Sequence, residues 1–248
     1  MATDRKRNSI SCQMSDQDEN AVLALDESLV PVRERKLPGI TSLTFDGLLD
    51  EPLLLKEDLK SGCGGQLWPA GMLLTEYLLR EQSEFLRGKT IVELGAGGGL
   101  VGLAVARGCP PLDDGQDDNL IYITDLPAMF PLMEENIALN KDLAPRVRPV
   151  VLDWAHPPPE EIPQHPAVVL AADCVYFEPA FPLLIETMER LIGPDTVCYF
   201  CYKRRRRADL RCIKQIKKKF HVEDLQGFVD ASAYARENLF LYRITRRK

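Results

Sequence analysis

The stretch VELGAGGGLVGLA, residues 92–104, constrains the fold more than any other part of this sequence. It joins an apolar, strand-like run to an apolar, helix-like run through Gly95, Gly97 and Gly99, which let the backbone turn sharply and approach a ligand closely. Gly102 lets the helix pack near the preceding strand. Such a strand–turn–helix unit is typical of an open α/β sheet, in which ligands lie outside the carboxyl ends of the strands.

Strand and helix patterns alternate through the rest of the chain. An apolar hairpin is expected within 40–58, strands over 89–94, 119–125, 147–153, 167–173, 196–202 and 237–246, and helices over 69–86, 99–108, 127–140, 179–193 and 207–220. Repeated strand–helix units predict a mostly parallel sheet with helices on both faces. We expect one α/β domain over 39–248, preceded by a polar, flexible tail over 1–38.

Composition excludes several classes of protein. A net charge of -6 over 248 residues does not suggest a generic nucleic-acid binder. Basic runs at 203–207 and 217–219 are either solvated surface or a patch that docks an acidic partner. We find no secretory signal and no apolar run near the ~18 residues of a membrane span.

The cysteines indicate a reducing compartment. Seven are scattered along the chain, which fits a cytoplasmic protein better than a disulfide framework. Cys198 and Cys201 lie in a strand-like stretch, where residues three apart point to opposite faces. We therefore expect both to pack in the core and to bind no metal.

Ligand-type side chains follow four successive strands. Glu93 precedes the glycines and suits a ligand with a cationic end, such as S-adenosylmethionine, better than a pyrophosphate. Asp125 ends the next strand, where a carboxylate accepts both hydroxyls of a ribose. Asp153 and Trp154 follow the third strand, where they suit an adenine edge and face. Asp173 ends the fourth.

The motifs VELGAGGGLVGLA, ITDLPAMFPLMEENIALN and LAADCVYFEPAFPLL resemble the seven-β-strand (class I) methyltransferases of family 16, which are mostly protein-lysine methyltransferases. SGCGGQLW and CYKRRRRADLRCIKQIKKKF resemble more closely the fungal members that act on translation elongation factor 1-alpha. The similarity runs from about residue 40. It implies a Rossmann-like fold with a mostly parallel seven-stranded sheet, S-adenosyl-L-methionine as cofactor and a protein substrate.

The resemblance also implies a role for individual residues. Trp68 would contact the methionine side of the cofactor, and Ala172 would line the floor beside the sulfonium. Asp173 and Tyr176 match the Asp-x-x-Tyr element at the substrate lysine. The remaining cofactor contacts would be the backbone of Gly95, Ala96 and Gly97, the ribose contact of Asp125 and the adenine contact of Trp154. We further expect a monomer that binds no metal, no membrane and no nucleic acid directly.

The expected chemistry is an in-line displacement that needs a neutral amine. A lysine has an ordinary pKa of about 10.4, so it must lose a proton first. An aromatic wall of Tyr176 and Phe177 favours the neutral amine by desolvation. Asp173 orients the amine, takes its proton through water, or merely caps the following turn.

Other readings start from different features. The KRRRR run favours a nucleic-acid methyltransferase, yet DCVY stands where adenine-N6 enzymes carry Asn/Asp-Pro-Pro-aromatic. GCPP reverses the Pro-Cys order of cytosine-C5 enzymes and lies in an acidic insertion. A small-molecule methyltransferase and a non-catalytic binding module with this fold are the remaining alternatives. Intact glycines and strand-end carboxylates argue against a module whose site has decayed.

Overall fold

The computed structural model describes residues 39–58, 63–111 and 120–247. The expected tail over 1–38 lies outside this range, as does most of the acidic insertion. The expected hairpin is confirmed, with β1 (Ile40–Leu43) antiparallel to β2 (Leu53–Lys56). Among the described residues, no helix is both long and apolar enough to cross a membrane.

The main sheet has seven strands in the order β5-β4-β3-β6-β7-β9-β8. Their bounds are β3 (Ile91–Leu94), β4 (Ile121–Asp125), β5 (Val147–Val151), β6 (Val168–Ala172), β7 (Val197–Lys203), β8 (Phe220–Asp224) and β9 (Leu239–Arg246). Strands β3 to β7 are parallel to one another, and β9 pairs antiparallel with both β7 and β8. The predicted α/β class with a mostly parallel sheet is confirmed.

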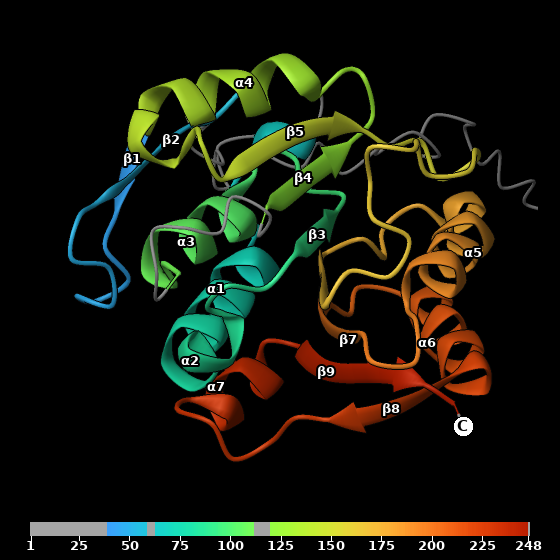
Figure 1. Ribbon diagram of the computed structural model, residues 1–248. Helices are drawn as coiled ribbons and strands as arrows, with labels where there is room; N and C mark the ends of the chain where they lie inside the picture. Colours follow the sequence, from blue (N-terminus) through green and yellow to red (C-terminus); the bar gives the residue numbers. More distant parts are fainter. Residues whose placement is uncertain (1–38, 59–62, 112–119, 248) are drawn as a thin grey trace, which may run out of the picture. The chain divides into compact units, whose positions relative to one another are not determined.

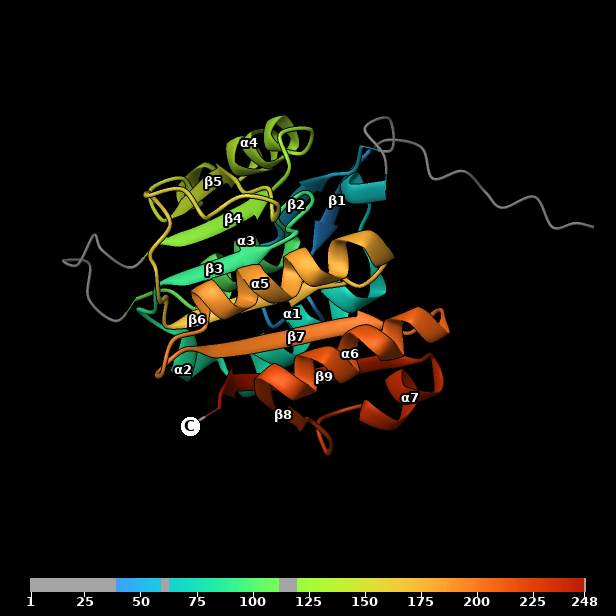
Figure 2. The ribbon, with the colours of Figure 1, turned by 90° about the vertical axis from the view of Figure 1, so that its right-hand side faces the viewer.

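Helices cover both faces of this sheet (Figures 1 and 2). The bounds are α1 (Pro69–Glu81), α2 (Ser83–Leu86), α3 (Leu100–Gly108), α4 (Phe130–Leu139), α5 (Phe181–Leu191), α6 (Arg207–Lys219) and α7 (Ala231–Arg236), with 3-10 turns η2 (Cys63–Gly65), η3 (Lys141–Leu143) and η4 (Glu178–Ala180). One face packs against α1 and α3, and the opposite face packs against α5 and α6. Strand order reverses at β3, which lies between β4 and β6. This position is the expected ligand-binding point of a doubly wound sheet.

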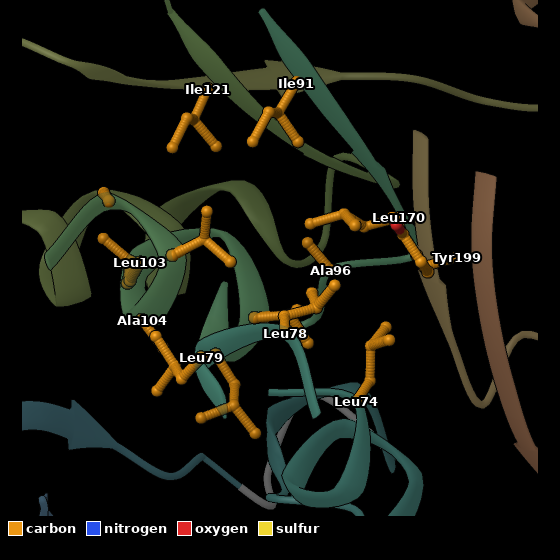
Figure 3. Packing of buried hydrophobic residues seen from close by; sticks show 14 of the residues in the cluster. Leu74, Leu78, Leu79, Ile91, Ala96, Leu103, Ala104, Ile121, Leu170 and Tyr199 are labelled. Carbon is orange, nitrogen blue, oxygen red and sulfur yellow. The ribbon is translucent and has the colours of Figure 1, made fainter. Parts of the chain in front are cut away.

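Two apolar cores follow from this layering. Figure 3 shows the first core, in which Leu74 and Leu78 of α1 pack with Leu103 of α3 and Ile91 of β3. The second core joins the apolar stripe of α5 to α6 on the other face. Cys198 belongs to the second core and Cys201 to the first, so the prediction that they point to opposite faces is confirmed.

Several elements differ from the sequence-based expectation: α7 was not expected, and the single helix expected over 69–86 is divided into α1 and α2. Residues 220–224 form strand β8 at the edge of the sheet, although we expected no strand there. Only Phe220 of this strand is buried, so the segment lacks the apolar alternation that indicates a strand. Helix α4 begins at Phe130 rather than at 127, because Leu126 and Pro127 accept hydrogen bonds in a preceding turn.

Candidate active site

The carboxyl ends of β3, β4, β5 and β6 lie at one edge of the sheet, because these strands are parallel. Backbone hydrogen bonds tie the segments that leave this edge. The Ala96 N–H donates to Thr124 O over 2.9 Å, and the Leu152 N–H donates to Asp125 O over 2.9 Å. The Cys174 thiol donates to Leu94 O over 3.1 Å. The turns after all four strands are therefore held next to one another.

The turn after β3 is a tight backbone cradle. Gly95 and Gly97 have φ of +61° and +56°, which L side chains rarely adopt. A Cβ on Gly97 would lie 2.2 Å from Gly64 O, so the 3-10 turn η2 presses against this loop. A Cβ on Gly95 would lie 3.4 Å from the Trp154 ring. The two glycines thus let the loop pack directly against η2, and an aromatic ring lies beside it.

Asp125 closes this cradle. Its Oδ2 accepts the Gly97 N–H over 2.7 Å and its Oδ1 accepts the Leu126 N–H over 2.7 Å. Burial raises the pKa of this carboxyl. Each carboxylate oxygen keeps a further lone pair, so the side chain can still accept two ribose hydroxyls. Glycine loop, carboxylate and aromatic ring together fit a nucleoside-containing cofactor.

Glu93 does not point out of the loop toward a cationic ligand as expected. Glu93 is 2% exposed, and its Oε2 accepts the Gly102 N–H at the start of α3 over 2.8 Å. Burial raises the pKa of Glu93 to about 8, so this carboxyl is mostly protonated at neutral pH and does not act as an anion for a cationic ligand. Asp153 bonds to the N–H of Ala155 and to His156 within its own turn.

Two asparagines that the sequence analysis missed hold the loop from α4. The Asn136 amide donates to Gly98 O over 2.8 Å and accepts the Lys56 N–H over 2.7 Å. The Asn140 amide bonds to both the N–H and the carbonyl of Leu54. These bonds join the hairpin strand β2 to α4 and to the glycine loop. Both side chains are buried, and Asn136 lies one turn after Met133 on the apolar face of α4, which was the available signal.

Asp173 lies at the tip of β6 in a left-handed backbone conformation, with φ of 56°. It is 7% exposed, and its Oδ1 accepts the Lys203 N–H over 3.2 Å. Both carboxylate oxygens also accept hydrogen bonds from the Arg205 guanidinium, over 2.8 and 2.6 Å. Every one of these bonds goes to the β7–α6 segment. The alternative that Asp173 merely caps the following turn is therefore wrong.

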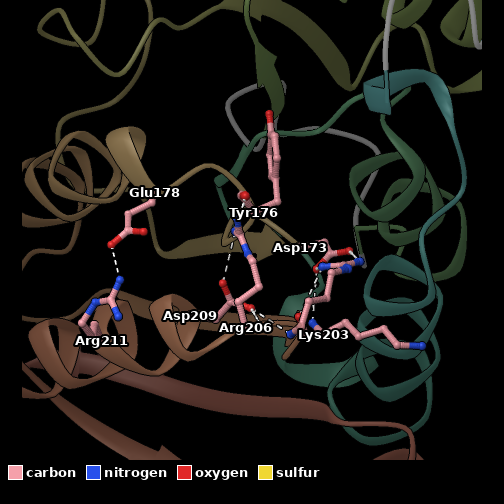
Figure 4. Close-up of polar contacts among 8 residues, drawn as sticks. Asp173, Tyr176, Glu178, Lys203, Arg206, Asp209 and Arg211 are labelled. Carbon is pink, nitrogen blue, oxygen red and sulfur yellow. Dashed lines mark hydrogen bonds and ion pairs between the residues drawn. The ribbon is translucent and has the colours of Figure 1, made fainter. Parts of the chain in front are cut away.

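Beyond the buried Cys174 and Val175, the chain after Asp173 forms an exposed rim. Tyr176 and Phe177 are 61% and 57% exposed. The Tyr176 ring extends away from α6, while its carbonyl accepts a hydrogen bond from Arg206 (Figure 4). The rim is thus anchored through its backbone and presents its aromatic rings outward.

Trp68 reaches the same place from the N-terminus of α1. The Arg205 guanidinium lies 5.4 Å from the centroid of its ring, within cation–π distance. Ala172 ends β6 and pairs in register with Cys201 of β7. The structure therefore gathers all the predicted site residues at one edge of the sheet. Among the described residues, no group of His, Cys, Asp and Glu side chains could hold a metal ion.

Comparison with known proteins agrees with this geometry. Residues 48–219 match a family described as lysine methyltransferase. The protein-lysine N-methyltransferase EFM6 of Saccharomyces cerevisiae is 37% identical over 88% of this chain and 96% of its own length. The mouse EEF1A lysine methyltransferase 3 is 32% identical over 75% of this chain and 74% of its own.

A solved structure shares the fold at low sequence identity. The 16S rRNA N2 G1207 methyltransferase RsmC of T. thermophilus, in complex with AdoMet and guanosine, superposes with a TM-score of 0.54 at 15% identity, covering 86% of this chain and 52% of that chain. The matched family spans the glycine loop, Asp125, Asp173 and the basic run, so one family accounts for every segment at this edge of the sheet. The chain belongs to the lysine methyltransferase family.

Proposed function

We propose that this S-adenosylmethionine-dependent protein-lysine methyltransferase modifies a lysine of translation elongation factor 1-alpha. The observation that carries the substrate is the similarity to mouse EEF1A lysine methyltransferase 3, supported by the frog protein of the same name at 28% identity. The yeast relative supports protein lysine as the acceptor. We expect the enzyme to act as a monomer in the cytoplasm, where translation takes place.

The cofactor half of the site is the edge formed by β3, β4 and β5. S-adenosylmethionine supplies a methyl group activated on a sulfonium. In our proposal Asp125 accepts hydrogen bonds from the two ribose hydroxyls, because its oxygens are fixed by the Gly97 and Leu126 amides and retain lone pairs. Trp154 lies against Gly95 and covers the adenine face.

The methionine side of the cofactor has its own contacts in this proposal. The backbone of Gly95, Ala96 and Gly97 approaches the cofactor closely, since the positive φ of both glycines excludes side chains there. Trp68 contacts the methionine portion, and Ala172 lines the floor next to Asp173.

The acceptor half is the rim after β6. Tyr176 and Phe177 provide an aromatic wall that removes water from the lysine amine and so favours its neutral form. The same faces tolerate a methylated ammonium product. Asp173 orients the amine by a hydrogen bond, which brings the nitrogen into line for displacement.

Methyl transfer to purified elongation factor tests this function. The enzyme is incubated with tritiated S-adenosylmethionine and with elongation factor 1-alpha produced in bacteria, and the modified residue is identified by mass spectrometry. We expect label on a lysine of the factor, lost after protease treatment and retained after nuclease. Label on nucleic acid, or none on the factor while other lysine-containing proteins are labelled, contradicts the proposed substrate.

A further inference from the structure

Arg205 occupies the acceptor side of the site. Its two terminal nitrogens donate to the two oxygens of Asp173 over 2.8 and 2.6 Å, which is a bidentate pairing. Asp173 is 7% exposed, whereas the Arg205 side chain is 32% exposed. The carboxylate assigned to the lysine amine is therefore already bonded to a cation that comes from the basic run.

The position of Arg205 is fixed from three sides. Asp209, in the first turn of α6, is 0% exposed, and its Oδ2 accepts the backbone N–H of both Arg205 and Arg206 over 2.8 Å. The Arg205 guanidinium lies over the Trp68 ring at 5.4 Å. Its Nη1 also donates to Lys203 O over 3.2 Å. These contacts link the tip of β6, the start of α6 and the start of α1.

A lone carboxylate at this place would oppose the reaction. An anion next to the acceptor stabilises the ammonium form, whereas methyl transfer needs the neutral amine. Pairing with a guanidinium removes most of that effect, because the net charge of the pair is zero. A carboxylate held by Arg205 still offers a hydrogen-bond acceptor in a fixed place.

The other titratable groups around Asp173 leave the zero net charge of the Asp173–Arg205 pair unchanged. Burial raises the pKa of the Cys174 and Cys201 thiols well above their usual range, so both are neutral. Asp209 of α6 is paired with Arg206. Lys203 meets Asp173 through its backbone N–H, and its side chain extends away from the carboxylate (Figure 4). The hydrogen bond to Asp173 raises the pKa of Arg205, which keeps it charged.

We propose that Arg205 is a positioning residue for methyl transfer: it holds the Asp173 carboxylate in place and cancels its charge, so that the substrate lysine loses its proton more readily. The inference rests on the role proposed above for Asp173. The acceptor ammonium releases one proton to water at the exposed rim. The nitrogen lone pair left behind forms the bond to the methyl carbon, whose bond to the sulfonium sulfur breaks and leaves its electron pair on a neutral thioether.

The test is the pH profile of kcat for Arg205→Gln, measured with saturating purified protein substrate, because kcat reports the pKa values of groups in the enzyme–substrate complex. Loss of the guanidinium leaves Asp173 unpaired, so the rising limb of the profile moves to higher pH. A displacement of one pH unit corresponds to about tenfold lower kcat at neutral pH, recovered at alkaline pH. Arg207→Gln removes the same charge two residues away, on an exposed side chain, and should leave the limb in place.

Two further variants separate charge from geometry. Arg205→Lys keeps the charge but loses the bidentate contact, so it should lower kcat without moving the limb. Asp173→Asn combined with Arg205→Gln restores a neutral pair, so its limb should return toward the wild-type pH even though kcat stays low. If Arg205→Gln does not fold, as judged by thermal melting, Arg205→Met takes its place, because this side chain is uncharged and still reaches the Trp68 ring.

The overturning results are specific. An Arg205→Gln profile that superposes on the wild type removes the charge-cancelling role. Higher kcat/KM with a lower KM at neutral pH would instead mean that Arg205 competes with the substrate lysine for Asp173. If Asp173→Asn alone keeps full activity, the proposed catalytic role of Asp173 fails first. If Asp173→Asn loses activity while the rising limb of the Arg205→Gln profile stays at the wild-type pH, only the inference about Arg205 fails.

Discussion

Among individual residues, Asp173 combines an unusual backbone with a buried charge. A positive φ of 56° is uncommon outside glycine, although Asp and Asn adopt it more readily than other residues. Strain of this kind persists where the surroundings hold it in place, here the Cys201 carbonyl, the Lys203 N–H and Arg205. The activity of a variant at this position therefore reports on the carboxylate only if the variant keeps the left-handed backbone conformation.

Asp173→Asn is the conformationally matched substitution, and Asp173→Ala the more disruptive one. We expect both to reduce methyl transfer by roughly a hundredfold or more, since the acceptor amine loses the group that orients it. Calorimetric affinity for S-adenosylmethionine should stay near the wild-type value. Near-normal turnover of Asp173→Asn would remove Asp173 from the catalytic machinery.

Tyr176→Ala should also abolish most methyl transfer with cofactor binding kept, because it opens the desolvating wall on the acceptor side. The side chain is 61% exposed, so the change should leave the unfolding transition almost unchanged. The comparison requires initial rates and a thermal melt on the same preparation. A rate equal to that of the wild type would show that the ring does not line the acceptor channel.

Asp125 belongs to the cofactor side. Asp125→Ala should weaken S-adenosylmethionine binding by more than the ~1 kcal/mol of an ordinary neutral hydrogen bond, because a charged acceptor of two hydroxyls is lost. Asp125→Asn keeps one acceptor oxygen, so its affinity for S-adenosylmethionine should lie between those of the wild type and Asp125→Ala. Isothermal titration calorimetry measures the difference directly, and unchanged affinity in Asp125→Ala would contradict the ribose assignment.

On the scale of elements, the glycine loop depends on a neighbour that is remote in sequence. Helix α4 holds both the hairpin strand β2 and the loop through Asn136 and Asn140. The hairpin thus supports the cofactor edge although it contributes no residue to the proposed contacts.

Removal of one asparagine tests this support. Asn140→Ala leaves the N–H and the carbonyl of Leu54 without their amide partner, which costs about 1–3 kcal/mol of unfolding free energy. Hydrogen exchange should show loss of protection in β2 before the main sheet opens. Thr75→Ala on α1, also a buried polar side chain but one whose hydroxyl has no hydrogen-bond partner, should cost less. Equal protection of β2 in Asn140→Ala and the wild type would show that this amide does not hold the hairpin.

The elements that the sequence predicts are those with strong apolar periodicity. The strands over 89–94 and 167–173 stand out as apolar runs, because both faces of these strands are buried. Helix α5 stands out because its apolar residues recur at helical spacing along one buried stripe. Strand β8 could not be predicted this way, because it is an edge strand with mainly exposed polar residues. Residues 220–224 form a strand because they pair with β9, and the sequence of 220–224 alone gives no sign of that pairing.

The site follows the same logic. Strand-end carboxylates and the glycines mark the cofactor edge, because ligand chemistry and backbone geometry restrict the residue types there. Arg205 carries no such mark: within a run of basic residues, only the fold shows which guanidinium turns inward to Asp173. Glu93 was misassigned for the related reason that its side chain turns under α3 rather than toward the ligand.

Across the whole molecule, Glu93 links stability to pH. Its pKa in the fold, about 8, lies above the ordinary 4.5, so the folded state binds a proton that the unfolded state releases. The stability that this group contributes is fully present below about pH 4.5 and is lost as the pH rises through about 8. The expected slope approaches ~1.4 kcal/mol per pH unit within that window.

Glu93→Gln removes this dependence, since the amide stays neutral at every pH. The unfolding free energy of the variant minus that of the wild type should therefore grow as the pH rises from 5 to 8 and level off above. Denaturant unfolding at a series of pH values gives both curves. Glu160→Gln, on an exposed side chain, provides the control, and parallel curves for Glu93→Gln and the wild type would contradict the link.

The order of the sheet has a consequence for how the chain is made. Strand β9 lies between β7 and β8, so a segment late in the sequence fills an interior position. During synthesis, β7 must wait with one edge unpaired until residues 239–246 have emerged, and an unpaired edge is prone to pairing with other chains. A ribosome paused upstream of Leu239 would carry an incomplete sheet, so we expect a nascent chain at this stage to be a substrate for chaperones.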